Sequence, residues 1–304
     1  MRIQQFLEHH GIVCNPFADE DAQTDLVFKS YCITHVHHPS WDKIYGEPSE
    51  PATAIVFGEK GSGKTAIGLQ VVRHLNAYNA EHRGGQAFVI LYDDFNPFLD
   101  RFRERFSGRK RGIESLLGQW MLWDHMDAIL ALGVTQLVDR LLDVKQARHP
   151  GAAADGPLEH GKLDAAQARD VLLLAACYDQ STGENVQQRW QAVRRKLRVP
   201  VWRSWLDVLL GLTVAGVVLG VVVGTGNWHY LKTFWPYLII AAGWLPWLAR
   251  RLKWTWTAHK VARNIRVVNQ SPALLRRMLG GLGARRLAGQ PLPAYQRKIG
   301  RAHV

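Results

Sequence analysis

Cysteine is scarce in this sequence, and no apolar leader opens it. The three cysteines, Cys14, Cys32 and Cys177, are widely spaced and odd in number, which argues against a disulfide framework and is typical of a reducing compartment. Residues 1–17 contain no apolar run long enough for a secretory signal peptide. We therefore expect the N-terminal half of the chain to stay in the cytosol.

Acidic residues are also in short supply. The chain has 26 Asp and Glu against 38 Lys and Arg, which gives a formal net charge of +12. Such an excess predicts an anionic partner, which could be nucleic acid, acidic lipid headgroups or nucleotide phosphates. A hydrophobic fraction of 47% in 304 residues excludes wholesale disorder and is enough for one large domain or two small ones.

Charge is absent altogether from two long runs in the C-terminal half. Val208–Trp228 contains 21 residues without a charge, and as a helix it would span about 30 Å, the thickness of a bilayer's hydrocarbon core. Thr233–Ala249 is a shorter uncharged run that contains Pro236 and Pro246. We predict that both runs are transmembrane helices and together form a hairpin.

Cations flank this predicted hairpin on both sides. They are Arg189, Arg194, Arg195, Lys196, Arg198 and Arg203 before it, and Arg250, Arg251, Lys253, Lys260, Arg263 and Arg266 after it. The connector carries only Lys232, so the positive-inside rule places both termini in the cytoplasm of a multi-pass inner (plasma) membrane protein. Acidic lipids then account for much of the excess charge, and nucleic acid becomes an unlikely partner.

A phosphate-binding motif lies far upstream of the hairpin. Gly58 to Thr65 reads GEKGSGKT and matches G-x-x-x-x-G-K-[ST] without a mismatch. Its glycines allow a sharp turn that points backbone N–H groups at a phosphate, while Lys64 neutralises the β- and γ-phosphates and the Thr65 hydroxyl binds Mg²⁺. The motif predicts ATP (or GTP) binding with Mg²⁺ by Gly58, Glu59, Lys60, Gly61, Ser62, Gly63, Lys64, Thr65 and Ala66.

The sequence around the motif predicts a βαβ unit. Ala52–Phe57 is an apolar, partly β-branched run typical of a buried strand, and Thr65–Asn79 has helical periodicity. Ala87–Tyr92 is predicted to be a second strand. We therefore expect an α/β fold with a parallel sheet and flanking helices. Further helices are expected within 97–142, interrupted at 101–112, and at 163–180 and 184–198.

Hydrolysis would need a carboxylate at a strand end to hold the magnesium shell. Asp93 and Asp94 end the second predicted strand and are candidate catalytic residues together with Lys64. The alternative is that they lie in a neighbouring loop without a role in catalysis. Asp179 imitates the same pattern, but the alanine-rich run before it is more typical of a buried helix.

Two further clusters allow weaker hypotheses. Cys32, His35, His37 and His38 could suggest zinc, but no second ligand pair follows at suitable spacing, so a partly buried histidine cluster is favoured. A second cluster consists of cations, namely Arg101, Arg103, Arg105, Arg109, Lys110 and Arg111. They are expected to form a solvated or lipid-facing surface. One of them could instead serve as an arginine finger for a neighbouring subunit, which leaves a homo-oligomer open.

Several of these motifs together resemble KAP-type NTPases, a group of bacterial membrane-associated P-loop ATPases. The motifs are Asn15-Pro16-Phe17, the phosphate loop, Tyr92-Asp93-Asp94-Phe95 and the later hairpin. The resemblance implies a P-loop NTPase three-layer parallel sheet with helical additions and an inserted two-helix transmembrane hairpin. It also implies a magnesium-binding aspartate on a strand after the hairpin. No apolar strand ending in Asp follows residue 250 here.

The C-terminal residues offer a reason for that departure. Residues 299–304 resemble translated sequencing-adapter DNA joined to a truncated reading frame, although an ordinary basic tail is the alternative. The predicted organisation is then a lead-in (1–50), the first part of an NTPase domain (51–200), the hairpin (204–250), a truncated cytoplasmic return segment (251–298) and this tail.

The leading functional hypothesis is a membrane-anchored, cytoplasm-facing ATPase in which nucleotide binding drives a conformational switch. The first alternative is a nucleotide-binding membrane scaffold or sensor without turnover. The second is a soluble DNA-associated ATPase whose apolar runs are core helices.

Overall fold

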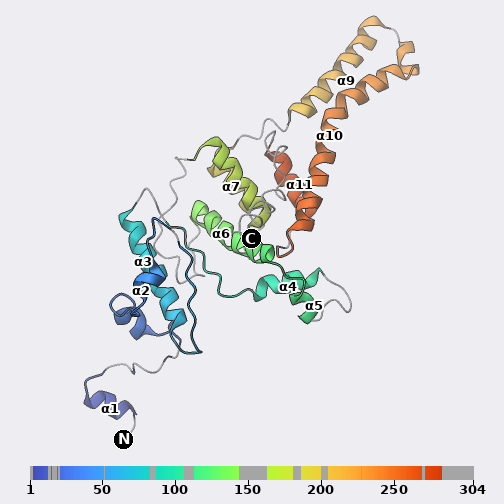
Figure 1. The fold of residues 1–304 in the computed structure, drawn as a ribbon. Helices are drawn as coiled ribbons and strands as arrows, with labels where there is room; N and C mark the ends of the chain where they lie inside the picture. Colours follow the sequence, from blue (N-terminus) through green and yellow to red (C-terminus); the bar gives the residue numbers. More distant parts are fainter. Residues whose placement is uncertain are drawn as a thin grey trace. The chain divides into compact units, whose positions relative to one another are not determined.

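The structure is a computed structural model of the chain. It describes residues 3–12, 15, 19, 21–50, 52–82, 87–105, 113–143, 163–180, 186–199, 205–226, 228–268 and 271–282. The chain divides into two compact units, of which the first comprises residues 1–91 and 146–156 and the second residues 92–145 and 157–304. Figure 1 shows that the regular elements in the described ranges are helices.

The first unit is organised around one long helix. Its helices are α1 (Ile3–His9), a π-helical turn (Phe28–Cys32), α2 (Trp41–Tyr45) and α3 (Lys64–Glu81). The Gln70 side chain, which is buried on α3, donates from Nε2 to the carbonyl oxygens of Val36 and Cys32. These hydrogen bonds hold the segment before α2 against the middle of α3.

The expected parallel sheet is not found, and the α/β prediction was wrong for the part of the chain that the structure describes. Ala52–Phe57 is extended but pairs with no strand, and Ile55 and Phe57, which the prediction buried, are 73% and 89% exposed. Ala87–Tyr92 also lacks a strand partner. The Asn79 side chain takes up both backbone groups of Ala87, with Nδ2–O and N–Oδ1 distances of 2.8 and 2.7 Å. A helix side chain therefore replaces a neighbouring strand at that residue.

The second unit has an all-helical core in its described residues. It is built from helices before and after the apolar hairpin, namely α4 (Asn96–Glu104), α5 (Ile113–Leu117), α6 (Leu122–Leu142), α7 (Ala165–Tyr178), α8 (Val186–Lys196), α10 (Trp235–Asn264) and α11 (Pro272–Gly281). Val138 of α6, Leu172 of α7 and Leu279 of α11 are among the fully buried residues that meet in one cluster. The spacing of apolar residues predicted α7 and α8 to within a few residues.

Helix α9 (Leu206–Thr225) is long and apolar enough to cross a membrane, and it is the only such helix among the described residues. Only 11% of its most apolar 18-residue window is buried, whereas a core helix of a soluble protein would be mostly covered. The uncharged part of α10 ends at Ala249 and contains Pro246, and this helix does not meet the same criteria. One membrane-compatible helix is therefore established by length and composition.

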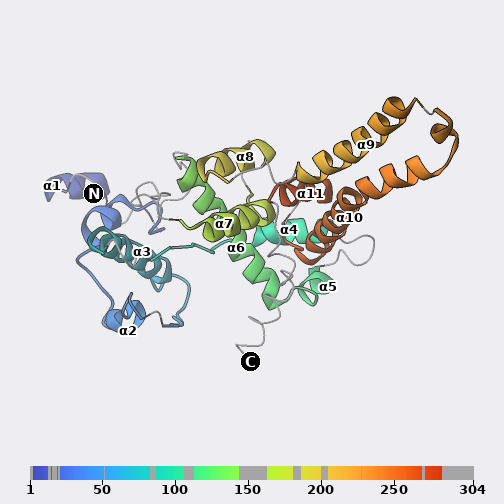
Figure 2. The same cartoon turned by 90° about the horizontal axis from the view of Figure 1, so that it is seen from above.

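Helices α9 and α10 run side by side, joined by a 3₁₀ turn at Trp228–Lys232 (Figure 1 and Figure 2). Glycines bring the two backbones together. A Cβ added to Gly211 of α9 would lie 2.8 Å from the Trp244 ring of α10, and one added to Gly243 of α10 would lie 2.8 Å from Val214 of α9. At the open end of the pair, Arg250 Nη1 lies 2.7 Å from Asp207 Oδ2.

The C-terminal half of α10 belongs to the helical core. Its Trp254, Ala258 and Val261 are buried there. The side chain of Arg105, just after α4, donates to the carbonyl oxygens of Ala262 and Val268 at 2.9 and 3.1 Å. One continuous helix therefore connects the apolar pair to the core.

Candidate phosphate-binding site

The predicted phosphate loop has a backbone conformation that depends on its glycines. Gly61 and Gly63 have φ values of +87° and +81°, in the left-handed region where a side chain is strained. Gly58 is needed for space, because a Cβ there would lie 2.3 Å from Ser62 Oγ. The loop thus folds back on itself. Gly61 and Gly63 adopt its positive φ angles, and Gly58 leaves room for the Ser62 side chain.

The Lys64 side chain returns over this loop. Its ammonium donates to the carbonyl oxygens of Gly58 and Glu59 at 2.8 and 2.7 Å, and to Ser62 Oγ at 3.4 Å. Lysine side chains in solution sample many rotamers. These contacts hold the positive charge above the loop, which is where the sequence predicted a phosphate group.

The loop ends in the N-terminus of α3. Gly63 is the residue that precedes the helix, and the Ile67 N–H donates to its carbonyl oxygen at 2.9 Å. The backbone N–H groups of Lys64, Thr65 and Ala66 come before that first helical hydrogen bond, so they have no acceptor within the helix. Together with the helix dipole they favour an anion at this end. These are local features of the loop and of the start of α3, and phosphate binding by the nine residues from Gly58 to Ala66 stays a prediction.

Asp93 and Asp94, the predicted catalytic carboxylates, belong to the second unit, whereas the phosphate loop belongs to the first. Both are exposed and follow an irregular segment rather than a strand. Asp94 Oδ1 accepts from the backbone N–H of Asn96 at 2.9 Å, at the start of α4. Their role in binding magnesium stays a prediction.

Next to these carboxylates lies an aromatic cluster that the sequence did not reveal. The Tyr92 hydroxyl and His125 Nδ1 of α6 are 2.8 Å apart, and burial raises the pKa of Tyr92. Trp120 packs edge-on against His125, with ring centroids 5.3 Å apart. The pattern of residues 87–92 indicated a strand, so nothing in it suggested a partner on a distant helix.

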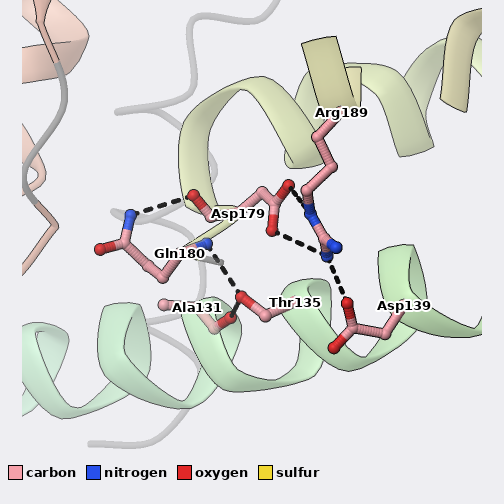
Figure 3. A network of polar contacts seen from close by, with 6 residues as sticks. All are labelled: Ala131, Thr135, Asp139, Asp179, Gln180 and Arg189. Carbon is pink, nitrogen blue, oxygen red and sulfur yellow. Dashed lines mark hydrogen bonds and ion pairs between the residues drawn. The ribbon is translucent and has the colours of Figure 1, made fainter. Parts of the chain in front are cut away.

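Asp179, the third carboxylate considered for magnesium, lies in the core instead. It follows α7, as expected if the alanine-rich run before it is a buried helix. The Arg189 Nε of α8 donates to Asp179 Oδ2 at 2.9 Å, and the same guanidinium also contacts Asp139 of α6 (Figure 3). Thr135 completes the network by accepting from the Gln180 N–H at 3.0 Å. The Arg189 guanidinium thus links α8 to α6 and to the end of α7.

The electrostatics of Arg189 follow from these partners. Burial alone would lower its pKa, but the hydrogen bonds and charges of Asp179 and Asp139 outweigh burial and raise the pKa above its ordinary value. The guanidinium therefore remains charged inside the core.

Two histidines of the first unit are in contact with each other, His74 of α3 and His37 of the segment before α2. His37 Nε2 and His74 Nε2 are 3.0 Å apart, and the Trp41 ring packs against both imidazoles. Among the described residues, no group of three or more His, Cys, Asp or Glu side chains is arranged to hold a metal ion. Burial, and then the charge of His37, lower the pKa of His74.

Two arginines of the cationic stretch, Arg101 in α4 and Arg105 just after it, make contacts within the second unit. Burial lowers the pKa of Arg105, whose guanidinium binds backbone carbonyls at the end of α10. The Arg101 guanidinium lies 5.7 Å from the centre of the Phe98 ring. Residues 109–111, the tail at 299–304 and Pro16-Phe17 lie outside the described residues.

Comparison with protein-family models, with curated proteins and with solved structures gave no match to this chain. The resemblance to KAP-type NTPases was therefore wrong. It rested on short motifs, and the sheet that defines the P-loop NTPase fold is missing from the described residues. The phosphate-loop prediction therefore rests on local geometry alone, at the N-terminus of α3.

Proposed function

We propose that this chain is a membrane-anchored nucleotide-binding protein, in which Gly58–Thr65 binds the phosphates of ATP or GTP together with Mg²⁺. The observation that carries the proposal is the position of the Lys64 ammonium, held at 2.8 and 2.7 Å from two loop carbonyls. A cation held in place loses little further conformational freedom when a phosphate binds. Of the partners that the net charge of +12 allows, a phosphate group fits this loop best.

The residues around Lys64 fit a magnesium nucleotide. The amides of the first turn of α3 would bind phosphate oxygens, and the Thr65 hydroxyl would ligate the metal. Mg²⁺ bound there would neutralise part of the phosphate charge. Gly58 keeps the loop narrow enough for Lys64 to reach across it, because a Cβ at this position would lie only 2.3 Å from Ser62 Oγ.

We further propose that α9 and α10 both enter the membrane as a hairpin, in a multi-pass protein of the inner (plasma) membrane with cytoplasmic termini. Support comes from the large apolar side chains that cover the outside of both helices and are exposed, among them Leu212, Val217 and Leu219 of α9 and Leu238, Ile239 and Leu245 of α10. Exposed apolar surface on this scale is unfavourable in water. Close packing through Gly211 and Gly243 is typical of helices that associate in lipid.

A nucleotide sensor or scaffold is the simpler proposal, because it needs no catalytic carboxylate. Asp94 accepts a hydrogen bond at the start of α4, and Asp179 is paired with Arg189. Hydrolysis that drives a conformational switch would need one of the described carboxylates, or another, to hold the magnesium shell. The exposed surface of α9 disfavours the soluble DNA-associated ATPase. Self-association of the chain stays a prediction.

Nucleotide binding is tested by comparing two lysines of the same loop. Full-length protein in detergent is titrated with a fluorescent ATP analogue and Mg²⁺, as wild type, Lys64→Ala and Lys60→Ala. We expect Lys64→Ala to weaken binding roughly tenfold or more, since hydrogen bonds to charged groups contribute about 1.5–3 kcal/mol. Lys60→Ala removes the same charge at a position where the motif accepts any side chain and only the backbone is predicted to bind, so its affinity should stay within a few fold of wild type. Equal affinity of wild type and Lys64→Ala would contradict the proposal.

Two further measurements separate the alternatives. Phosphate release by wild type and by Lys64→Ala distinguishes an ATPase from a sensor: equal rates defeat the enzyme hypothesis, and a rate lost with Lys64 establishes it. Extraction of membranes with high salt and with alkaline carbonate tests the anchor. Release by salt alone would rule out the hairpin and favour the soluble protein.

A further inference from the structure

One face of the cytoplasmic half of α10 is both cationic and aromatic, and it is exposed. Lys253, Trp256, Lys260 and Arg263 follow one another at intervals of three, four and three residues, so they share a face of the helix. All four are exposed, Trp256 by 68% of its surface. We refer to these four residues as the α10 stripe. The opposite face carries Trp254, Ala258 and Val261, which are buried.

We propose that the α10 stripe binds the headgroups of anionic phospholipids at the cytoplasmic surface of the membrane. This inference rests on the proposed membrane anchor and extends it, because it assigns a particular face of the chain to the lipid surface. The partner is chosen by three properties of the stripe: its charge, its exposed tryptophan and its position on the helix.

The charge of α10 has a single sign. Its thirty residues, Trp235–Asn264, contain no Asp or Glu, so no acidic side chain on this helix competes for the cations of the stripe. Salt and distance weaken the attraction of scattered cations to a membrane, but cations close to an anionic surface contribute substantially to binding. This property favours an anionic partner and does not yet distinguish lipid from nucleic acid.

The tryptophan makes that distinction. A run of solvated cations requires no apolar side chain, yet the Trp256 ring stands exposed with the Lys260 ammonium 5.0 Å from its centre. Tryptophan is enriched at the level of the headgroups, where its ring meets the apolar boundary and its N–H remains hydrated. Leu252, which is also exposed, lies next to the stripe on the same side of the helix.

Continuity with the hairpin places the stripe near the bilayer. The apolar half of α10 ends at Ala249, only four residues before Lys253. From Lys253 to Arg263 the helix rises about 15 Å, whereas the headgroup layer of one leaflet is about 5–8 Å thick. The stripe can contact headgroups along its length only if this half of α10 leaves the membrane obliquely. Pro246 lies near the end of the apolar half, and a proline inside a helix is a site where a change of direction is expected.

The test measures lipid selectivity of the full-length protein in phosphatidylcholine bilayers. Trace spin-labelled phosphatidylglycerol or phosphatidylcholine is added, and electron paramagnetic resonance gives the fraction of each label that the protein immobilises. We expect wild type to prefer phosphatidylglycerol severalfold. Lys253→Gln/Lys260→Gln/Arg263→Gln should lower the preference to roughly one- to twofold, since each cation near the surface contributes measurably. Trp256→Ala should lower it as well.

The matched control removes three exposed cations from other helices: Lys43→Gln/Arg73→Gln/Arg277→Gln. Its selectivity should stay at the wild-type level, and circular dichroism should show all variants folded. If wild type immobilises lipid without any preference, or if the control loses the preference equally, the proposal for the α10 stripe is overturned. The proposed membrane anchor is not affected by either result. Absence of any immobilised lipid overturns the membrane anchor itself. Binding of duplex DNA that depends on Lys253, Lys260 and Arg263 in place of lipid selectivity also overturns the proposal.

Discussion

The Nε of Arg189 donates to Asp179 Oδ2 at 2.9 Å inside the second unit, where the two side chains are 1% and 2% exposed. The same guanidinium reaches Asp139, so one cation binds two carboxylates (Figure 3). Burial of so much charge is tolerated only when each ion is paired and hydrogen-bonded. The contact therefore indicates where the helical core is most sensitive to a single substitution.

Arg189→Met should destabilise the second unit by about 3–5 kcal/mol, because the buried Asp179 carboxylate loses its ion pair with Arg189. The control is Lys196→Met, which breaks the Lys196–Asp143 pair, whose side chains are 26% and 57% exposed. Surface pairs of this kind contribute about 0–1 kcal/mol. Chemical unfolding in detergent, followed by circular dichroism, measures both. Equal losses for the two variants would contradict the assignment.

Gly58→Ala should weaken nucleotide binding, because the new Cβ would stand 2.3 Å from Ser62 Oγ and force the loop open. The double variant Gly58→Ala/Ser62→Ala removes the closest clashing atom and should recover part of the affinity. A fluorescent ATP analogue reports the binding. Recovery is the decisive readout, since a loop that needs Gly58 only for backbone flexibility would gain nothing from the loss of the Ser62 hydroxyl.

Gly211→Ala should loosen the hairpin, because its Cβ would lie 2.8 Å from the Trp244 ring. Gly220→Ala on the same helix is the control, since nothing lies within 4 Å of that position. Alanine also favours a helix by up to about 1 kcal/mol over glycine, so the control should be neutral or slightly stabilising. Thermal unfolding in detergent, followed by tryptophan fluorescence, compares them. Indistinguishable midpoints would show that α9 and α10 do not pack through Gly211.

The first unit should lose stability in acid through His74. Burial and the neighbouring His37 lower the pKa of His74 below 6.5, so between the two values the unfolded chain binds more protons than the folded one. Stability therefore falls as the pH drops from about 6.5 through the lowered pKa, and this contribution is constant below it. His74→Gln should flatten that part of a stability–pH profile. An unchanged profile would exclude His74 as the group that titrates.

Helices with a strong sequence signal were predicted correctly, whereas the predicted sheet was wrong for the described residues. The apolar periodicity of 65–79 predicted α3 (Lys64–Glu81), and the uncharged run 208–228 predicted α9 (Leu206–Thr225). Short apolar runs are ambiguous, because only pairing with a neighbour turns an extended segment into a strand. Ala52–Phe57 finds no such neighbour in the described residues.

The same difference between local sequence signals and long-range packing applies to the candidate site. The loop residues Gly58 to Thr65 were predictable because their chemistry is local in sequence. The partners of Asp179 and Arg105 were not, since Arg189 and the carbonyls of Ala262 and Val268 are brought to them only by the packing of helices. No spacing rule in the sequence links residues 105 and 262.

The core of the second unit contains residues from both sides of the apolar hairpin, from Phe98 of α4 to Leu282 after α11. A ribosome delivers α4, α6, α7 and α8 first, and the surface that α11 covers on α7 and α8 stays exposed until the later helices follow. Because α10 and α11 are synthesised after α9, the core can be completed only after the hairpin has been made. A nascent chain stopped between α8 and α9 would expose apolar helix surfaces to chaperones and proteases.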